Sequence, residues 1–226
     1  MTNPFVARSG KRQKGQTARE TKVPKGMSMP PEDLAKIREA IRRRYASVAD
    51  RPEGQFAYPV GRSSLEALGY RSDFLERLPA AVVDRFVGVG NPFSMGEAHP
   101  GENVLDIGCG CGLDAQVAAF VVGPEGNVRG VDLSEEMLEV AREGKEQTSL
   151  TNLEYRLGAA EALPVESGWA DLVVTNGVLN LSTCKASAFA EIFRVLKPGG
   201  RFQAADLVLD SDLPPDLLEN PAAWST

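Results

Sequence analysis

The stretch Val104-Leu105-Asp106-Ile107-Gly108-Cys109-Gly110-Cys111-Gly112 places an apolar run directly before three glycines at alternate positions. This pattern predicts a buried strand that turns sharply into a helix, because residues without a Cβ permit both the turn and a close approach of the backbone to a ligand. An acidic residue, Asp132, ends the next strand-like run, where its carboxylate can accept hydrogen bonds from two ribose hydroxyls. Together these features predict a site for a nucleotide-type cofactor.

The spacing of the glycines helps to distinguish between two kinds of cofactor-binding turn. A dinucleotide-binding fold uses G-x-G-x-x-G, which would place the third glycine where Leu113 stands. The chain has G-x-G-x-G instead, and three further segments follow in order: Gly158–Pro164, Ala170–Asn176 and Arg194–Phe202. In this spacing and order the chain resembles the class I methyltransferases that depend on S-adenosylmethionine (SAM). The resemblance implies SAM as the cofactor and a Rossmann-like fold.

Hydrophobic periodicity predicts alternating strands and helices after residue 100. We expect strands over 103–107, 128–131, 153–157, 171–175 and 201–208, and helices over 113–122, 135–143 and 186–196. Such βαβ order predicts an α/β fold with a doubly wound, mostly parallel sheet. Ligands of these sheets bind beyond the carboxyl ends of the strands, and the segments quoted above all fall at such ends.

The chain is expected to consist of three regions. Residues 1–30 carry seven basic residues against one acidic residue, which predicts a disordered basic tail. Residues 31–100 are expected to form a helical cap, beginning with an amphipathic helix over 31–48 whose three arginines, Arg42 to Arg44, form a solvated face. Residues 101–226 are predicted to form the SAM-binding domain. This domain is expected to be shortened, because a complete sheet of this class adds two more strands after the fifth.

Composition narrows the classes of function. The chain has 226 residues, 42% of them hydrophobic, which suffices for a full core, and no stretch is apolar enough to span a membrane. A net charge of −6 argues against nucleic acid as a partner and favours a small-molecule acceptor. Three cysteines, two of them in the glycine turn, do not suggest a disulfide framework, so a cytoplasmic location is expected.

The predicted cofactor residues follow from the strand ends. Gly108, Gly110 and Gly112 would let the turn pass beneath the methionine and ribose portions of SAM. Asp106 is placed to meet the methionyl ammonium, directly or through water, although it could also hydrogen-bond loop amides. Asp132 is assigned to the ribose, whereas Leu133 and Met137 would flank the adenine. Ala160, Glu161 and Asn176 complete the predicted set of cofactor contacts.

Several segments resemble the arsenite methyltransferase-like branch of this class. They are Arg51–Pro59, Ala67–Tyr70, Gly88–Phe93 and Thr175–Leu181. Authentic arsenite enzymes hold trivalent arsenic through cysteine thiolates, which are soft ligands for a soft centre. By this resemblance Val89 and Gly177 stand where those enzymes place cysteines. The branch is therefore indicated, whereas its arsenic-binding thiols are missing and no metal site is expected.

The remaining thiols and the adenine-binding loop also depart from the family pattern. Cys109, Cys111 and Cys184 do not match the ligand positions, and the lone histidine, His99, is expected at the surface. Typical relatives place an aspartate after Gly158 to accept from the adenine amine, but here Ala159 follows. Loss of such a bond predicts SAM binding weaker by about tenfold to a hundredfold, unless Glu161 or the backbone compensates.

The sequence says least about which residues contact the methyl acceptor. Candidate substrate contacts are Asn176 and Asn180, which flank the end of the fourth strand, and Tyr58 and Tyr70 from the cap. Two interpretations stay open: an active small-molecule methyltransferase with a changed substrate, and a catalytically degenerate SAM-binding or scaffold module that acts through a partner. A nicotinamide oxidoreductase is disfavoured by the glycine spacing.

Overall fold

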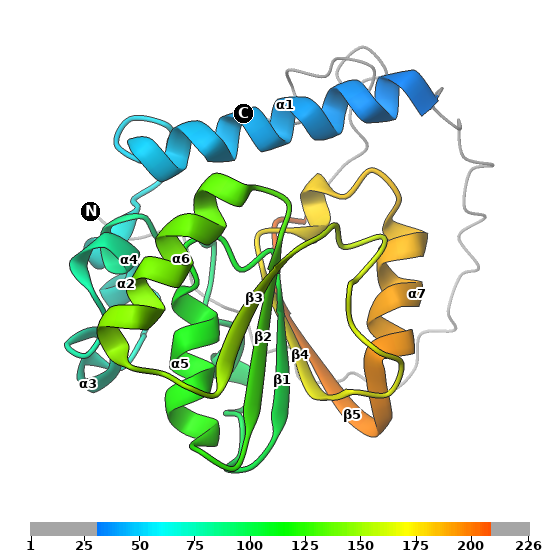
Figure 1. Cartoon of the computed structure of the whole chain (residues 1–226). Coiled ribbons are helices and arrows are strands. Elements are labelled where there is room, and N and C mark those ends of the chain that lie inside the picture. Colours follow the sequence, from blue (N-terminus) through cyan, green and yellow to red (C-terminus); the bar gives the residue numbers. More distant parts are fainter. Residues whose placement is uncertain (1–30, 209–226) are drawn as a thin grey trace, which may run out of the picture. The chain divides into compact units, whose positions relative to one another are not determined.

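A computed structural model describes residues 31–208, which are built around a five-stranded sheet (Figure 1). The strands are β1 (Asn103–Ile107), β2 (Asn127–Asp132), β3 (Leu153–Leu157), β4 (Ala170–Asn176) and β5 (Leu196–Ala205). Their order is β3-β2-β1-β4-β5 and every neighbouring pair is parallel, which confirms the predicted doubly wound α/β fold. From β1 the strand order runs to one edge through β2 and β3, and to the other edge through β4 and β5. Sheets of this kind bind ligands at the position where the order reverses, here between β1 and β4.

Helices cover both faces of the sheet (Figure 1). α5 (Leu113–Val122) and α6 (Glu135–Thr148) lie on one face, and α7 (Lys185–Val195) lies on the other. Because successive strand residues point to opposite faces, Val104 packs with the alanines of α5 while Leu105 packs with Ile192 of α7. β1 is therefore buried on both sides, and four of its five residues are buried.

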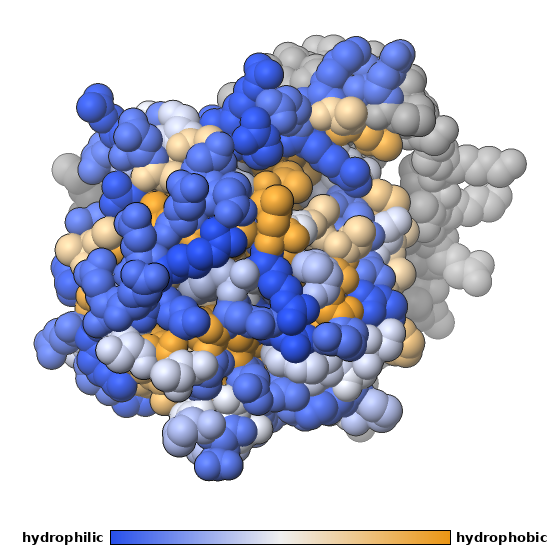
Figure 2. All heavy atoms as spheres, in the orientation of Figure 1, coloured by the Kyte–Doolittle hydropathy of each residue, from blue (hydrophilic) through white to orange (hydrophobic). Residues whose placement is uncertain are grey.

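The residues before β1 form short helices and one long one. They are α1 (Pro31–Asp50), α2 (Gly61–Ala67), α3 (Ser72–Leu75), α4 (Ala80–Asp84) and the 3-10 helix η1 (Pro92–Met95). The helix predicted over 31–48 is confirmed and continues to Asp50. α1 crosses above the carboxyl ends of the strands and contacts α6. Apolar side chains gather directly below α1 in the space-filling view (Figure 2).

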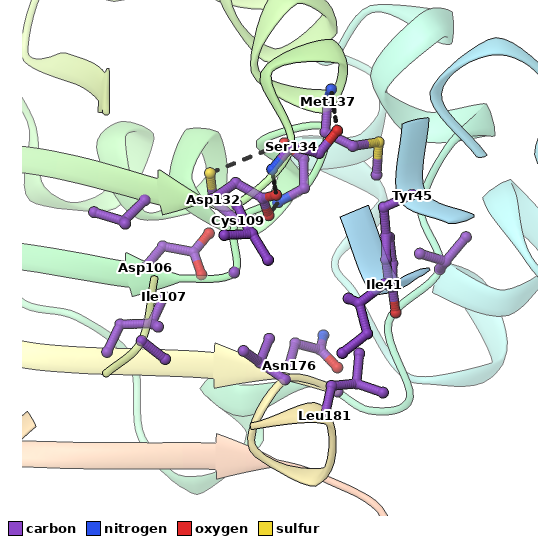
Figure 3. Close-up of a pocket in the computed structure, with 18 of the residues that line it drawn as sticks. Ile41, Tyr45, Asp106, Ile107, Cys109, Asp132, Ser134, Met137, Asn176 and Leu181 are labelled. Atoms are coloured by element: carbon purple, nitrogen blue, oxygen red, sulfur yellow. Dashed lines mark hydrogen bonds between the residues drawn. The ribbon is translucent and has the colours of Figure 1, made fainter. Parts of the chain in front are cut away.

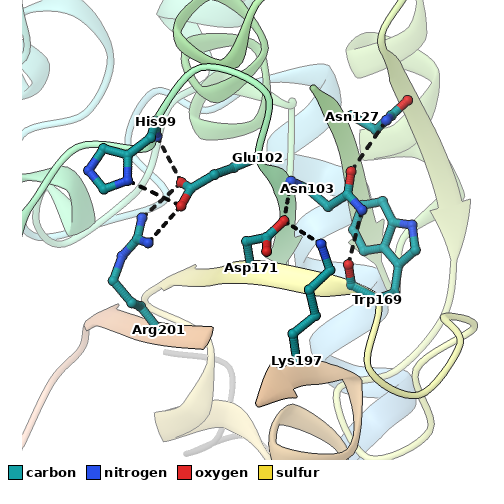
Figure 4. Close-up of polar contacts among 8 residues, drawn as sticks. All are labelled: His99, Glu102, Asn103, Asn127, Trp169, Asp171, Lys197 and Arg201. Carbon is teal, nitrogen blue, oxygen red and sulfur yellow. Dashed lines mark hydrogen bonds and ion pairs between the residues drawn. The ribbon is translucent and has the colours of Figure 1, made fainter. Parts of the chain in front are cut away.

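A polar cluster fastens the opposite, amino edge of the sheet (Figure 4). Glu102 accepts two hydrogen bonds from Arg201 of β5, at 2.7 and 2.8 Å, and these lower the pKa of Glu102 to about 2. Asp171 of β4 accepts from the Asn103 amide at 2.9 Å and from Lys197 at 2.7 Å. These contacts join β1, β4 and β5 at the end that faces away from the ligand edge.

Two predicted elements differ from the structure by more than two residues. The helix predicted over 135–143 continues to Thr148 and ends where Ser149 adopts a left-handed conformation, with φ 55°. The strand predicted over 201–208 begins at Leu196 and ends at Ala205, so Lys197-Pro198-Gly199-Gly200 belongs to a strand with a shifted register rather than to a turn. The predictions of a basic tail and of a shortened sheet both concern residues outside the described range. No helix of the described range is long and apolar enough to cross a membrane.

Gly112 is a point where the turn and the sheet leave no room for a side chain. Its φ is +81°, and an added Cβ would lie 2.2 Å from the Tyr155 hydroxyl oxygen and 2.9 Å from the Ala141 Cβ. We expect Gly112→Ala to lower the free energy of unfolding by about 2–5 kcal/mol, because left-handed strain and overpacking add. Gly101→Ala is the control, because Gly101 has φ +82° and no heavy atom within 4 Å. In urea denaturation the control should lose only about 1–2 kcal/mol, and equal losses would refute the packing argument.

Candidate cofactor site at the carboxyl edge of the sheet

A cavity opens beneath α1 at the carboxyl ends of β1, β2 and β4. In Figure 3, Ile41 and Tyr45 of α1 face Asp106 and Asp132 across the open space. The structure brings most of the predicted cofactor residues to this cavity: Asp106, Gly108, Gly110, Asp132, Leu133, Met137, Ala160, Glu161 and Asn176 line it.

The glycine turn forms the floor of the cavity. The Gly108 amide donates to the Val131 carbonyl at 2.7 Å, so the turn is joined to the end of β2. At φ +68°, a Cβ on Gly108 would lie 2.3 Å from Cγ2 of Val178. A residue without a side chain is thus required here, and the backbone stays open to a ligand.

Asp132 is held in place by backbone amides. Its Oδ2 accepts from the Gly110 amide at 2.8 Å, and its Oδ1 accepts from the Ser134 amide at 2.9 Å. Burial raises the pKa of Asp132, and these amide bonds act in the opposite direction. The Ser134 hydroxyl in turn accepts from the Met137 amide and caps α6. The carboxylate therefore has a fixed orientation, and each oxygen retains a lone pair that can accept another donor.

Two buried aspartates lie behind the turn. Asp106 is 2% exposed and its Oδ2 has no hydrogen-bond partner. Asp114, at the start of α5, accepts from the Tyr70 hydroxyl at 2.6 Å and from the Asn176 amide nitrogen at 3.0 Å. Burial raises the pKa of Asp114 to about 6, and burial together with the Asp114 charge raises the pKa of Asp106. The unpartnered oxygen of Asp106 calls for a cationic or hydrogen-bonding ligand.

Asn176 connects the end of β4 to the segment before η1. Its Oδ1 accepts from the amides of Val89 at 2.9 Å and Gly90 at 3.1 Å, and its Nδ2 donates to the Gly90 carbonyl at 2.8 Å. All of these bonds are internal, so the side chain positions the cavity wall as well as lining it. This arrangement could not be predicted from the strand pattern.

One face of α1 supplies cavity residues that the sequence reasoning missed. Arg38, Ile41, Arg42 and Tyr45 line the cavity at helical spacing i, i+3, i+4, i+7. Arg42, predicted to be solvated, donates to Glu39 and to Glu136 of α6, and Arg38 lies 3.8 Å from Glu161. The amphipathic spacing was the available signal, but it does not say which face covers a ligand.

Four predicted site residues do not line the cavity. The Tyr58 hydroxyl donates to the Val87 carbonyl, and Tyr70 lies behind the wall on Asp114. The backbone amide of Asn180 donates to Asp206, and Gly112 packs under Tyr155. The two tyrosine hydroxyls are engaged by internal partners, and their predicted role as substrate contacts stays a prediction.

The thiols and the histidine occupy separate environments. Cys109 and Cys111 are buried, and burial raises both pKa values, that of Cys111 to about 12. Cys184 and His99 are exposed, as predicted for His99. Among the described residues no group of three or more His, Cys, Asp or Glu side chains could hold a metal ion. Val89 and Gly177 are neighbours: a Cβ on Gly177 would lie 3.5 Å from Cγ1 of Val89.

The raised pKa of Asp114 predicts a pH effect on stability. The folded state favours the protonated carboxyl, so the associated stability is full below about pH 4 and is lost as pH rises through about 6. We expect the free energy of unfolding to fall more steeply over this interval in the unmodified chain than in Asp114→Asn. Removal of the Asp114 charge also lowers the pKa of Asp106, which changes the slope in the same direction. Urea denaturation at several pH values measures both slopes, and identical slopes would contradict the assignment.

Comparison with known proteins agrees with this geometry. Residues 98–226 match the family described as "Methyltransferase domain". An arsenite methyltransferase of Halobacterium salinarum is 36% identical over 203 residues, which are 84% of this chain and 52% of that protein. A demethylmenaquinone methyltransferase of Lactococcus lactis is 42% identical over 101 residues, which are 45% of this chain and 40% of that protein. The chain thus spans about half the length of the relatives it matches.

Solved structures give the same result. The crystal structure of an arsenic(III) S-adenosylmethionine methyltransferase from Chlamydomonas reinhardtii aligns with TM-score 0.55 at 33% identity, covering 73% of this chain and 55% of that one. A SAM-dependent methyltransferase from Aquifex aeolicus, at 21% identity and TM-score 0.53, shares the fold. The chain belongs to the methyltransferase domain family, with the Rossmann-like fold of the SAM-dependent enzymes, and is similar to arsenite methyltransferases.

Proposed function

We propose that the chain binds SAM in the cavity below α1 and transfers its methyl group to a small-molecule acceptor. The observation that carries the proposal is the arrangement around the glycine turn. Asp106 presents an unpartnered buried oxygen, the turn offers bare backbone, and Asp132 presents a fixed carboxylate. The oxygen of Asp106 suits an ammonium group, the bare turn suits a ligand that lies close to the backbone, and the carboxylate of Asp132 suits a pair of hydroxyls. SAM has an ammonium group and a ribose with two hydroxyls in one molecule.

The protein's part in such a reaction is mainly positional. SAM, when bound, supplies a methyl group that is already activated on a sulfonium. The chain has to align the acceptor with that group and keep water out, an effect that can reach about 7–11 kcal/mol. Ile41 and Tyr45 of α1 contribute apolar surface over the cavity, and Leu181 lines it from η2 (Leu179–Leu181). No acid or base of this chain is assigned to the transfer itself.

We infer that the acceptor is a molecule other than arsenite. Val89 and Gly177 lie side by side, yet neither carries a thiol. Cys109 lines the cavity, but its burial raises the thiol pKa and disfavours the thiolate that a soft arsenic centre requires. In this proposal the chain shares its ancestry with the arsenite branch but acts on a different substrate.

A second candidate is a SAM-binding module without catalysis that acts through a partner. Ala159 favours it, because this residue lines the cavity where the family places a hydrogen-bonding aspartate. Glu161 also lines the cavity, but its Oε1 already accepts from the hydroxyls of Ser182 at 2.7 Å and Thr183 at 3.4 Å. Compensation by Glu161 would therefore compete with these bonds.

Calorimetric titration with SAM tests the proposal. We expect saturable binding by the unmodified chain and its loss in Asp132→Ala, since removal of a charged acceptor costs about tenfold to a hundredfold in affinity. Asp171→Ala is the matched control, because Asp171 is a hydrogen-bonded carboxylate at the other edge of the sheet and should leave SAM binding intact. Absence of binding at millimolar SAM would refute both candidates. Binding followed by methylation of an acceptor in a screen would favour the enzyme over the module.

The missing thiols generate a separate prediction. The double variant Val89→Cys with Gly177→Cys would place two thiols next to each other beside the cavity. We expect it to bind one arsenite per chain, whereas the unmodified chain and Val89→Cys alone bind far less tightly. Gly177 has φ +72°, so the double variant should also be less stable by about 1–2 kcal/mol. Tight arsenite binding by the unmodified chain, measured by equilibrium dialysis, would overturn the inferred change of substrate.

A further inference from the structure

Tyr45 carries a hydroxyl group that has no hydrogen-bond partner within residues 31–208. The hydroxyls of the other three tyrosines are all bound inside the protein: that of Tyr58 to the Val87 carbonyl, that of Tyr70 to Asp114 and that of Tyr155 to the Gly112 carbonyl. Tyr45 instead lines the cavity from α1, together with Ile41 one turn earlier. Its hydroxyl is therefore available to a ligand.

The Tyr45 hydroxyl lies above the carboxyl ends of the central strands. The charges of Asp132, at the end of β2, and of Asp206, directly after β5, both act on it. Since β1 and β4 lie between those two strands, the hydroxyl is placed over their ends. In Figure 3, Tyr45 and Leu181 lie on the side of the open space opposite Asp106. The group therefore lies on the side of the cavity that η2 bounds.

The Tyr45 hydroxyl stays protonated at neutral pH. Burial raises the pKa of Tyr45, with smaller contributions in the same direction from Tyr58, Asp132 and Asp206. A protonated hydroxyl has one proton to donate and lone pairs to accept with, so it can bind a polar group but does not act as a base. A hydroxyl removed from water without a partner is unfavourable. The position therefore favours a ligand with a polar group at this point.

The cavity wall on this side is apolar. Side chains from three segments form it: Ile41 of α1, Phe86 and Val87 between α4 and η1, and Val178 and Leu181 after β4. Asn176, at the end of β4, is a polar residue of the same wall, but its oxygen and its nitrogen are both engaged in internal hydrogen bonds. The Tyr45 hydroxyl is thus a free polar group among apolar side chains.

The cationic side chains that line the cavity are already engaged. Each has partners inside the protein: Arg38 lies 3.8 Å from Glu161, Arg42 pairs with Glu39 and Glu136 at 3.0 and 3.2 Å, and Arg85 donates to the carbonyls of Ala49 and Ala81. The carboxylates of Asp106 and Asp132 lie across the open space from Tyr45, at the groups assigned to the cofactor. A charged acceptor would lose its hydration on entry and would have to displace one of these contacts to gain an opposite charge. An uncharged acceptor avoids both costs.

We propose that the methyl acceptor is an uncharged, largely apolar small molecule and that the Tyr45 hydroxyl forms a hydrogen bond with its polar group. The proposal rests on the function proposed above and adds to it the class of acceptor and the residue that orients it. Apolar contacts with the wall bind the body of such a molecule, whereas one directional hydrogen bond fixes which end faces the cofactor. Tyr45 is thus a specificity-determining residue, and no proton transfer is assigned to it.

Two other roles for Tyr45 are outcomes of the test. Its hydroxyl could bind the cofactor, because Asp132 acts on it, in which case its loss would weaken S-adenosylhomocysteine, the product form of the cofactor. Its ring could instead serve only as a cover, in which case loss of the hydroxyl would change no affinity. The acceptor is favoured because Gly177, one of the two positions without a thiol, lines the same cavity beside Val178.

Four ring probes of nearly equal size test the class of acceptor, by fluorine NMR titration of the chain saturated with S-adenosylhomocysteine. 4-Fluorobenzyl alcohol is neutral and carries one hydroxyl, and 4-fluorotoluene has no polar group. At neutral pH 4-fluorobenzoate is an anion and 4-fluorobenzylamine is a cation. We expect both charged probes to bind at least about tenfold more weakly than the alcohol, because each loses hydration without gaining a free opposite charge.

Tyr45→Phe keeps the ring and its packing and removes only the hydroxyl. It should weaken 4-fluorobenzyl alcohol by about threefold to tenfold, the range of one neutral hydrogen bond, and leave 4-fluorotoluene and S-adenosylhomocysteine unchanged. Tyr155→Phe is the matched control, because its hydroxyl is bound to the Gly112 carbonyl and lies outside the cavity, so neither neutral probe should change. Leu181→Lys places a cation in the wall and should raise the affinity for 4-fluorobenzoate.

Calorimetry with S-adenosylhomocysteine separates this proposal from the function on which it rests. If the unmodified chain does not bind it, both fall. The acceptor class alone is overturned, with the proposed function intact, if the loaded chain binds none of the probes or binds a charged probe as tightly as the alcohol. The role of Tyr45 is overturned if Tyr45→Phe weakens S-adenosylhomocysteine or leaves the alcohol unchanged. Thermal unfolding of each variant without ligand checks that the substitutions leave the fold intact.

Discussion

The site depends on a turn whose backbone must stay bare while a neighbouring carboxylate holds it. Val178 occupies the space that a side chain on Gly108 would need, and Asp132 accepts from the amide of Gly110. Packing from β4 and hydrogen bonding from β2 therefore act on the same turn. Because β1 lies between those strands in the sheet, its end cannot move without disturbing both.

This constraint explains why the charged groups of the cavity can remain buried. Burial disfavours ionised carboxylates, and Asp106, Asp114 and Asp132 all have raised pKa values. A rigid backbone supplies amide donors at Asp132, and Tyr70 and Asn176 supply donors at Asp114. Asp106 lacks such compensation at one oxygen, which makes it the position where a cationic ligand group gains most.

Local sequence patterns predicted most of the sheet and part of the site. The strand over 103–107 and the helix over 113–122 match β1 and α5 at both ends, because apolar residues and flanking glycines mark their limits. β5 was harder to delimit, since Pro198 and two glycines usually indicate a turn, whereas in the structure they form an irregularity within the strand, between the Ala170–Leu196 and Leu172–Arg201 pairs. Pairing across the sheet is a tertiary effect, so the local sequence does not contain it.

Tertiary contacts that the local sequence does not contain are even more important at the site. Asp106, Asp132 and the first two glycines could be placed in it because strand ends converge in any parallel sheet. The contribution of α1 depends on how a helix distant in sequence crosses that edge, which periodicity leaves open. The hydrogen bond from the Tyr70 hydroxyl to Asp114 is a further tertiary contact that the sequence does not reveal.

The two positions that lack the thiols of the arsenite branch lie together at the wall that follows β4. The glycine turn and the ends of β1 and β2 carry the groups suited to a cofactor, whereas Val89 and Gly177 sit where β4 meets the segment before η1. The two sets are joined through Asn176, whose bonds run to Val89, Gly90 and Asp114. A change of acceptor can thus arise by substitution at two adjacent positions without altering the backbone contacts that shape the cofactor side.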